Sequence, residues 1–222
     1  MLYTEEIVRD NIRTREGKRV FFLGKGDTLT PGARDFLTRE RIEIRPADQA
    51  KMEEYRLLGG GILREKPEHM THLEGNLLVE KNHPRIVFRG MVDGLQAEIL
   101  LCQLEIPEVR QELGQILELS REIIRRDVLE EPLEDRKLCG LTQQELRTHS
   151  HRPQDFYGQP HFMPKWEDGE KILRLNALRC RVRDVERAAV AAFGGERVDL
   201  LRALNRMSSM VYILMIRMKR ER

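Results

Sequence analysis

The sequence predicts a mainly α protein, an antiparallel bundle of four to five helices preceded by a small N-terminal α/β module. Charged residues make up 34% of the 222-residue chain and aromatic residues only 5%, a composition that favours helix-rich proteins over sandwiches and barrels. From residue 83 onward, long segments with apolar residues at helical spacing are separated by short breaks. Before residue 60, short helical and strand patterns alternate. The length suits one domain plus a small one.

Residues 1 to about 60 form the predicted accessory module. Its expected elements are a helix over 4–13, a strand over 19–25, a helix over 29–40 and a strand over 42–46. Thr30 is the expected N-cap of the second helix and Pro31 its first residue. The segment 57–67 carries three glycines and a proline, which is typical of a linker. A helical domain over residues 65–222 is expected to follow.

Four long helices are predicted in that domain. Their expected ranges are 82–105, 107–131, 168–193 and 196–220. Asn82 is the candidate cap of the first, and a shorter helix begins with the capping box of Thr142 and Glu145. Short breaks between long helices favour antiparallel neighbours, which is the basis of the bundle prediction.

Composition also excludes several classes of partner and site. The 39 Lys and Arg residues nearly balance the 37 Asp and Glu residues, so no overall field attracts nucleic acid. Cys102, Cys139 and Cys180 show no paired spacing, which argues against disulfides and a zinc ribbon. The histidine pairs at 69/72 and 149/151 have too few ligands nearby to predict a metal site. The charged N-terminus and a seven-residue apolar run predict a cytoplasmic protein without membrane contact.

The helix over 175–193 has charged residues along the border of its apolar face. At about 100° per residue, Arg179, Arg183 and Glu186 lie one quadrant from that face, whereas Arg181 and Asp184 are expected to face solvent. The apolar face consists of Leu178, Val182, Val185 and Ala189. Guanidinium groups in a groove between helices would suit a polyphosphate, but a solvated ladder of charges has the same spacing. Spacing alone leaves both interpretations open.

Two other helices also carry polar residues that could either form structural contacts or bind a ligand or a partner. Asn205 and Ser208 lie on an otherwise apolar face, so they either form an interhelical polar contact or reach a ligand. Arg85, Arg89 and Asp93 follow one another at intervals of four. Taken alone, this spacing favours a surface Arg89–Asp93 pair; the alternative is that Asp93 meets an arginine from another helix or subunit.

Three segments in this order, "KNHPRIVFRGMVDGL", "LRCRVRDVERAAV" and "ALNRMSSMVYILMI", resemble the corrinoid adenosyltransferases that share the PduO-type bundle. The likeness is nearest to their ethanolamine-utilization branch. The resemblance implies a trimer that binds ATP, with Mg²⁺, and cobalamin at subunit interfaces. It implies transfer of the 5′-deoxyadenosyl group of ATP to Co(I), with release of triphosphate. The alternative is a non-catalytic relative that holds, delivers or senses adenosylcobalamin.

The resemblance assigns roles to residues of the last two helices. Arg183 matches the first arginine of an R-R-A-E-R motif and would contact the triphosphate. Glu186 and Arg187 match the end of that motif, while Asp184 replaces its second arginine. Asn205 matches an asparagine that reaches the nucleotide. Among these, Arg183 and Glu186 are the expected catalytic residues.

Further roles follow from the same resemblance. Arg179 and Asp93, also expected in the catalytic set, match the partners of a salt bridge between subunits. Lys81 and Arg85 match ATP-binding positions of a K-x-D-P-R motif, although His83 stands where an aspartate is usual. The expected corrinoid-binding residues are His161, Phe162 and Met163.

The chain departs from its branch in two places. The cysteine cluster that some members carry is absent before "HMTHLEG", so no protein-bound metal is predicted. The "TKxGDxGxT" phosphate loop is also not recognisable. The resemblance further implies a product used by ethanolamine ammonia-lyase, with contact to that enzyme or to a bacterial microcompartment.

Overall fold

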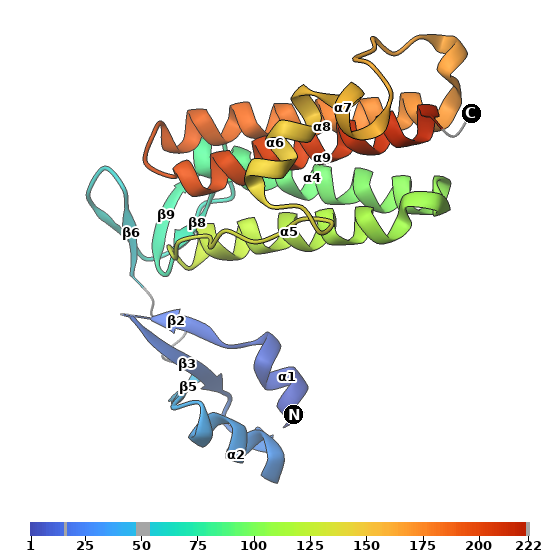
Figure 1. The fold of residues 1–222 in the computed structure, drawn as a ribbon. Helices are drawn as coiled ribbons and strands as arrows, with labels where there is room; N and C mark the ends of the chain where they lie inside the picture. Colours follow the sequence, from blue (N-terminus) through green and yellow to red (C-terminus); the bar gives the residue numbers. More distant parts are fainter. Residues whose placement is uncertain (16, 48–53, 221–222) are drawn as a thin grey trace. The chain divides into compact units, whose positions relative to one another are not determined.

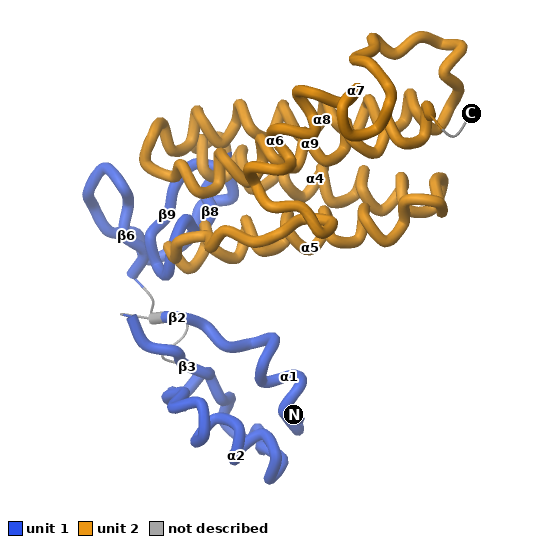
Figure 2. The backbone as a smooth tube through the Cα atoms, in the orientation of Figure 1, with its two compact units in different colours: residues 1–81 blue, residues 82–222 orange. Residues whose placement is uncertain are grey.

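The computed structural model describes residues 1–15, 17–47 and 54–220. The chain forms two compact units, Met1–Lys81 and Asn82–Arg222 (Figure 2), and the mainly α class is confirmed. The units meet in sequence at residues 81 and 82, fourteen residues beyond the end of the predicted linker at residue 67. The reason is that residues between 55 and 80 form strands, which the sequence patterns did not predict.

The described residues of the first part of unit 1 form two helices and two small sheets. Helices α1 (Glu5–Asp10) and α2 (Pro31–Arg39) pack on a core that includes Phe21 and Phe36. One sheet pairs β2 (Arg13–Arg15) antiparallel and β5 (Glu43–Pro46) parallel with β3 (Lys18–Leu23). The other pairs β1 (Leu2–Tyr3) with β4 (Thr28–Leu29). The predicted Thr30 cap is confirmed, because its hydroxyl accepts from the Ala33 backbone N–H at 3.3 Å.

The segment predicted as a linker belongs instead to a four-stranded sheet of order β7-β6-β9-β8. Its strands are β6 (Tyr55–Leu57), β7 (Ile62–Leu63), β8 (Met70–Glu74) and β9 (Leu77–Glu80). The glycines form the turn of the β6–β7 hairpin, where Gly60 and Gly61 have φ angles of 91° and 103°. Such angles favour glycine. The linker prediction was wrong because the same residue types that are common in linkers also build tight turns.

Unit 2 is helical. Its helices are α4 (Pro84–Glu105), α5 (Arg110–Val128), α6 (Gln143–His151), α7 (Pro153–Tyr157), α8 (Gly169–Phe193) and α9 (Val198–Arg220), with short 3₁₀ turns at Pro107–Val109 and Trp166–Asp168. Figure 1 shows α4, α5, α8 and α9 lying side by side, with α6 beside α9. Among the described residues, no helix combines the length and apolar character that crossing a membrane requires.

Of two predicted helix starts, one is confirmed and the other lies one residue later than predicted. The capping box is confirmed, since the Thr142 backbone N–H donates to Glu145 Oε2 at 2.8 Å and the Thr142 hydroxyl accepts from the Glu145 N–H. At α4 the cap is His83 rather than Asn82, because His83 Nδ1 accepts from the Arg85 N–H at 3.3 Å. Pro84 at the first helical position fixes this boundary one residue later than predicted.

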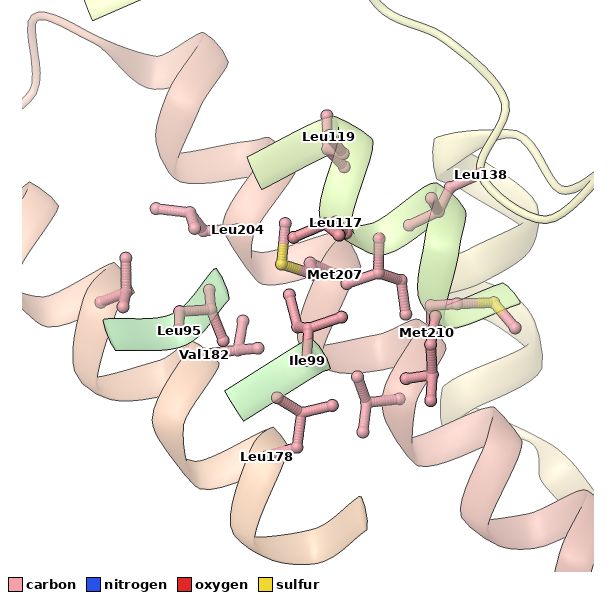
Figure 3. Packing of buried hydrophobic residues seen from close by; sticks show 14 of the residues in the cluster. Leu95, Ile99, Leu117, Leu119, Leu138, Leu178, Val182, Leu204, Met207 and Met210 are labelled. Atoms are coloured by element: carbon pink, nitrogen blue, oxygen red, sulfur yellow. The ribbon is translucent and has the colours of Figure 1, made fainter. Parts of the chain in front are cut away.

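The core of unit 2 lies between its long helices. Figure 3 shows Leu95 and Ile99 of α4 meeting Leu178 and Val182 of α8, with Leu204 of α9 beside them. All four residues of the predicted apolar face of α8, including Val185 and Ala189, are fully buried. This packing fixes the rotation of α8 about its own axis and therefore fixes where its arginines lie.

Candidate functional site

The polar residues predicted on α8 and α9 contact one another. Asn205 Nδ2 donates a hydrogen bond to Glu186 Oε1 at 2.9 Å, and both side chains are half-buried. Ser208 instead donates to the Asn205 carbonyl of its own helix at 2.8 Å. The interhelical contact foreseen for Asn205 is thus confirmed, and its partner is a residue that the resemblance also assigned to the site.

Arg183 and Arg187 flank Glu186 on the exposed border of α8. Arg187 donates to Asp184, three residues back. Within the described ranges, Arg183 has neither an ion pair nor a side-chain hydrogen bond. One helix border therefore carries a guanidinium free to bind an anion beside the Glu186–Asn205 pair.

Asp93 and Arg179 do not meet within this chain. The Arg179 guanidinium carbon lies 5.2 Å from the centre of the Tyr212 ring, a cation–π contact. Asp93 is exposed on α4 and has no ion pair with any residue the structure describes. The salt bridge between subunits that the resemblance implies for these two residues stays a prediction.

The surface pair that the spacing favoured for Arg89 and Asp93 is not formed. Arg89 Nε donates to Asp127 Oδ2 of α5 at 2.5 Å, and Arg85 Nη2 donates to Asp127 Oδ1 at 2.9 Å. Asp127 is fully buried, so two guanidinium groups supply the hydrogen bonds that a buried carboxylate requires. Helical spacing could not reveal a partner some forty residues away in the sequence.

Arg85 is held further by Glu130, whose Oε1 accepts from Arg85 Nη1 at 3.0 Å. Burial lowers the pKa of the Arg85 guanidinium, but the hydrogen bonds and charges of Glu130 and Asp127 outweigh burial and raise it. An ATP contact from Arg85 would require this side chain to leave its acidic partners. Its predicted role in nucleotide binding therefore stays a prediction.

Arg181 does not face solvent as predicted. A Cβ atom added at Gly94 of α4 would lie 2.3 Å from Arg181 Nη2, so the guanidinium lies against the backbone of α4. Its Nε is buried, with no hydrogen-bond partner among the described residues. Asp184 is also half-buried. The helix angle alone missed the placement of Arg181, because a neighbouring helix with a glycine leaves room for a long side chain; Asp184 is partly covered and pairs with Arg187 of its own helix.

Tyr212 of α9 joins the predicted corrinoid residues to α8. Its hydroxyl accepts from the Phe162 backbone N–H at 3.3 Å and lies 3.1 Å from His161 Nδ1. His161 Nε2 lies 3.0 Å from the His151 carbonyl, an acceptor only, so Nε2 is a donor in this contact. The same ring lies beneath Arg179. The position of the Tyr212 hydroxyl on an apolar helix face was the one sequence signal that this residue holds the loop of His161 and Phe162.

The two apolar loop residues differ in exposure. Phe162 is half-buried, with the Lys219 ammonium 4.7 Å from the centre of its ring. Met163 is 82% exposed, so an apolar side chain projects from the loop beside the Tyr212 cluster.

Comparison with known proteins decides the family. The profile described as "Cobalamin adenosyltransferase" matches residues 62–218. This chain belongs to the cobalamin adenosyltransferase family. Proteins named "Corrinoid adenosyltransferase EutT" from Escherichia coli (strain K12) and Salmonella typhimurium (strain LT2) are each 31% identical to it over 96% of this chain and 90% of their own.

The cobalamin adenosyltransferase match begins at the β6–β7 hairpin of unit 1 and runs through α9. It includes β8, β9 and every side chain predicted for the site. Lys81, the predicted ATP-binding residue at the end of unit 1, is exposed and lies 3.6 Å from Glu68. Among the described residues, no three His, Cys, Asp or Glu side chains form a group able to hold a metal ion.

Proposed function

We propose that this cobalamin adenosyltransferase family member transfers the 5′-deoxyadenosyl group of ATP to the Co(I) of a corrinoid. The observation that carries the proposal is the border of α8, where Arg183, which has no ion pair with any described residue, lies beside the Glu186–Asn205 hydrogen bond. Full-length similarity to proteins named corrinoid adenosyltransferases supports the same reaction.

The reaction explains why the site holds cations and an amide rather than a nucleophile. Co(I) attacks C5′ of ATP, the C5′–O bond breaks, and its electron pair leaves with triphosphate. The cobalt becomes formally Co(III) as the Co–C bond forms, and no proton has to move. The protein therefore has to hold C5′ close to cobalt and stabilise charge on the departing triphosphate. Arg183 and Arg187 suit the second task.

Asn205 and Glu186 position the nucleotide in this proposal. Their hydrogen bond of 2.9 Å fixes the amide, and the Asn205 Oδ1 accepts from Arg206. A fixed amide and carboxylate bind the ligand without first having to lose rotamer freedom. Lys81 and Arg85 are proposed as further ATP contacts from the resemblance. Magnesium would accompany the triphosphate, because it needs few protein ligands and keeps several waters.

The corrinoid would contact the loop that Tyr212 holds. Met163 and Phe162 supply the apolar side chains, and His161 is held by Tyr212 and the His151 carbonyl. An apolar side chain that displaces the lower axial ligand of cobalt would leave a four-coordinate Co(II), which is easier to reduce to Co(I). This loop is therefore proposed to prepare the substrate as well as to bind it.

The site is proposed to be completed by a neighbouring copy of the chain. Asp93 has no ion-pair partner among the described residues, and the resemblance pairs it with Arg179 across a subunit interface. We infer a trimer in which the four long helices form an antiparallel bundle. The product would serve ethanolamine ammonia-lyase, in contact with that enzyme or a microcompartment.

The substitution Arg183→Ala tests the assignment of the triphosphate contact. Removing one preorganised charge donor costs about 10²–10³ in turnover, so cob(I)alamin consumption with ATP under anaerobic conditions should fall by about that factor. Arg121→Ala, at an exposed position of α5, is the matched control and should retain wild-type rates. Normal turnover by Arg183→Ala would refute the role of Arg183.

A further inference from the structure

A pocket of 610 Å³ lies among the segment that follows α5, the start of α6 and the first half of α9. That volume falls within the range of small-molecule sites. Its charged lining consists of Arg136, Lys137, Arg147, Arg202, Arg206 and Asp135. In a chain of almost zero net charge, five cations around one cavity are a local concentration of positive charge.

The carboxylate that lines the pocket and those of Glu145 and Glu186 on the neighbouring helices already have partners. Asp135 accepts from Gln143 Nε2 at 2.5 Å and lies 3.8 Å from Arg202. Glu145 accepts from the Thr142 N–H, and Glu186 from Asn205. In the part of the chain that the structure describes, Arg136, Lys137 and Arg147 have no ion pair. The cations of the pocket therefore outnumber the acids able to neutralise them.

Two polar atoms in this lining lack hydrogen bonds. The Nε of Arg206 and the Oε1 of Gln143 are buried, with no partner among the described residues. Burial, and then the charge of Arg147, lower the pKa of the half-buried Arg206 guanidinium. A buried donor without an acceptor costs about 1–3 kcal/mol, and an anion in the pocket would satisfy the Arg206 Nε donor and relieve the repulsion between the cations; the Gln143 oxygen is an acceptor and gains nothing from an anion.

We propose that this pocket binds a small, multiply charged anion of the phosphate class, up to the size of triphosphate. Guanidinium forks match tetrahedral oxyanions, and the cations that line this open pocket, contributed by two helices and a loop, surround a volume of 610 Å³, the size of a small-molecule site. The site differs from the one proposed for ATP, since neither Arg183 nor Arg187 lines it. The two sites adjoin through Arg206, which donates to Asn205.

Isothermal titration calorimetry with inorganic triphosphate tests the proposal on the full chain. Wild type should bind at two sites, one of them the site of the proposed reaction. Arg147→Glu, a change at an exposed residue, should weaken triphosphate binding at the pocket about tenfold or more. Arg121→Glu is the matched control and should bind like wild type. Arg183→Ala should weaken triphosphate binding only at the site of the proposed reaction and should leave binding at the pocket unchanged.

Several results decide the matter. Unchanged binding by Arg147→Glu would overturn the proposal, as would loss of ATP binding by that variant, which would place the pocket in the nucleotide site. If wild type shows a single site that Arg147→Glu removes and Arg183→Ala spares, the pocket stands and the proposed reaction site fails. Lys137→Glu should repeat the effect, with circular dichroism confirming that each variant is folded. Inorganic phosphate and sulfate should bind more weakly than triphosphate.

Discussion

Four arginines of α8 have four different surroundings although they share one helix. Arg179 lies over Tyr212, Arg181 lies against Gly94, Arg183 has no partner in the described part of the chain, and Arg187 pairs with Asp184. Sequence spacing predicted their angles about the helix axis. It could not predict the contacts of Arg179 and Arg181, because those come from α9 and α4, whereas the pair of Arg187 with Asp184 lies within α8 at a spacing of three.

Asp127 is a second residue whose contacts could not be predicted from sequence spacing. Nothing in the pattern around "REIIRRDVLEE" sets this carboxylate apart, yet it is fully buried between Arg85 and Arg89. The interhelical contact of Asn205, by contrast, was one of the two interpretations that the sequence left open, since Asn205 lies on an apolar face that had to pack; its partner Glu186 was not predicted. Polar residues on such faces were the informative ones in this sequence.

Asp199, at the start of α9, predicts a pH-dependent stability. Burial raises the pKa of its carboxyl, but hydrogen bonds from Arg197 and from the Leu133 and Leu200 N–H groups, with the charge of Arg197, lower it to about 2. Because the pKa of Asp199 is lower in the folded state than in the unfolded state, its carboxylate stabilises the fold at pH values above the unfolded pKa near 4. This stabilisation is lost as the pH falls from about 4 to about 2. Asp199→Asn should cost about 1–2 kcal/mol at pH 7.

Urea denaturation followed by circular dichroism at several pH values measures this effect. The difference in unfolding free energy between wild type and Asp199→Asn should shrink as the pH falls below 4. Asp155→Asn, which changes an exposed ion pair, should cost less than about 1 kcal/mol at any pH. A pH-independent difference for Asp199→Asn would contradict the assigned pKa.

At the level of elements, the long helices were predictable because periodicity and caps agree. The four residues of the α8 face are all buried, and α6 begins at the predicted box of Thr142 and Glu145. The β6–β7 hairpin was not predictable in the same way, since "LLGGGILREKP" has the composition of a turn and of a linker alike. Which one forms depends on pairing of β6 with β9, some twenty residues away in the sequence.

The capping box of α6 predicts a measurable loss of stability. Thr142→Ala removes the hydroxyl that accepts from the Glu145 N–H at 3.2 Å, and cap losses cost about 0.5–2 kcal/mol. Thr148→Ala provides a control, because that hydroxyl bonds only to the Gln144 carbonyl of its own helix. Equal urea midpoints for Thr142→Ala and wild type would show that the cap does not stabilise the fold.

At the scale of the whole molecule, the family match and the compact units divide the chain at different places. The match begins at residue 62, inside unit 1, whereas the units divide after Lys81. The strands β7 to β9 thus lie within the family match although they belong to unit 1. A boundary set by composition alone could not place them, because short strands carry a weak periodic signal.

The proposed trimer is tested through Asp93. Light scattering during size-exclusion chromatography should give three chains per particle for wild type. Asp93→Arg should dissociate the particle or lower its assembly, because a cation would then face the partner's arginine. Asp10→Arg, in unit 1 and exposed, should leave the mass unchanged. A wild-type monomer would contradict the inference that a neighbouring copy completes the site.

The products of wild-type turnover test the central claim most directly. Anaerobic incubation of the protein with cob(I)alamin and ATP, followed by quantification of the corrinoid and phosphate products, measures them. The proposed reaction predicts adenosylcobalamin and intact inorganic triphosphate in equal amounts, with loss of the cob(I)alamin absorbance only when ATP is present. Absence of adenosylcobalamin, or release of ADP in its place, would contradict it.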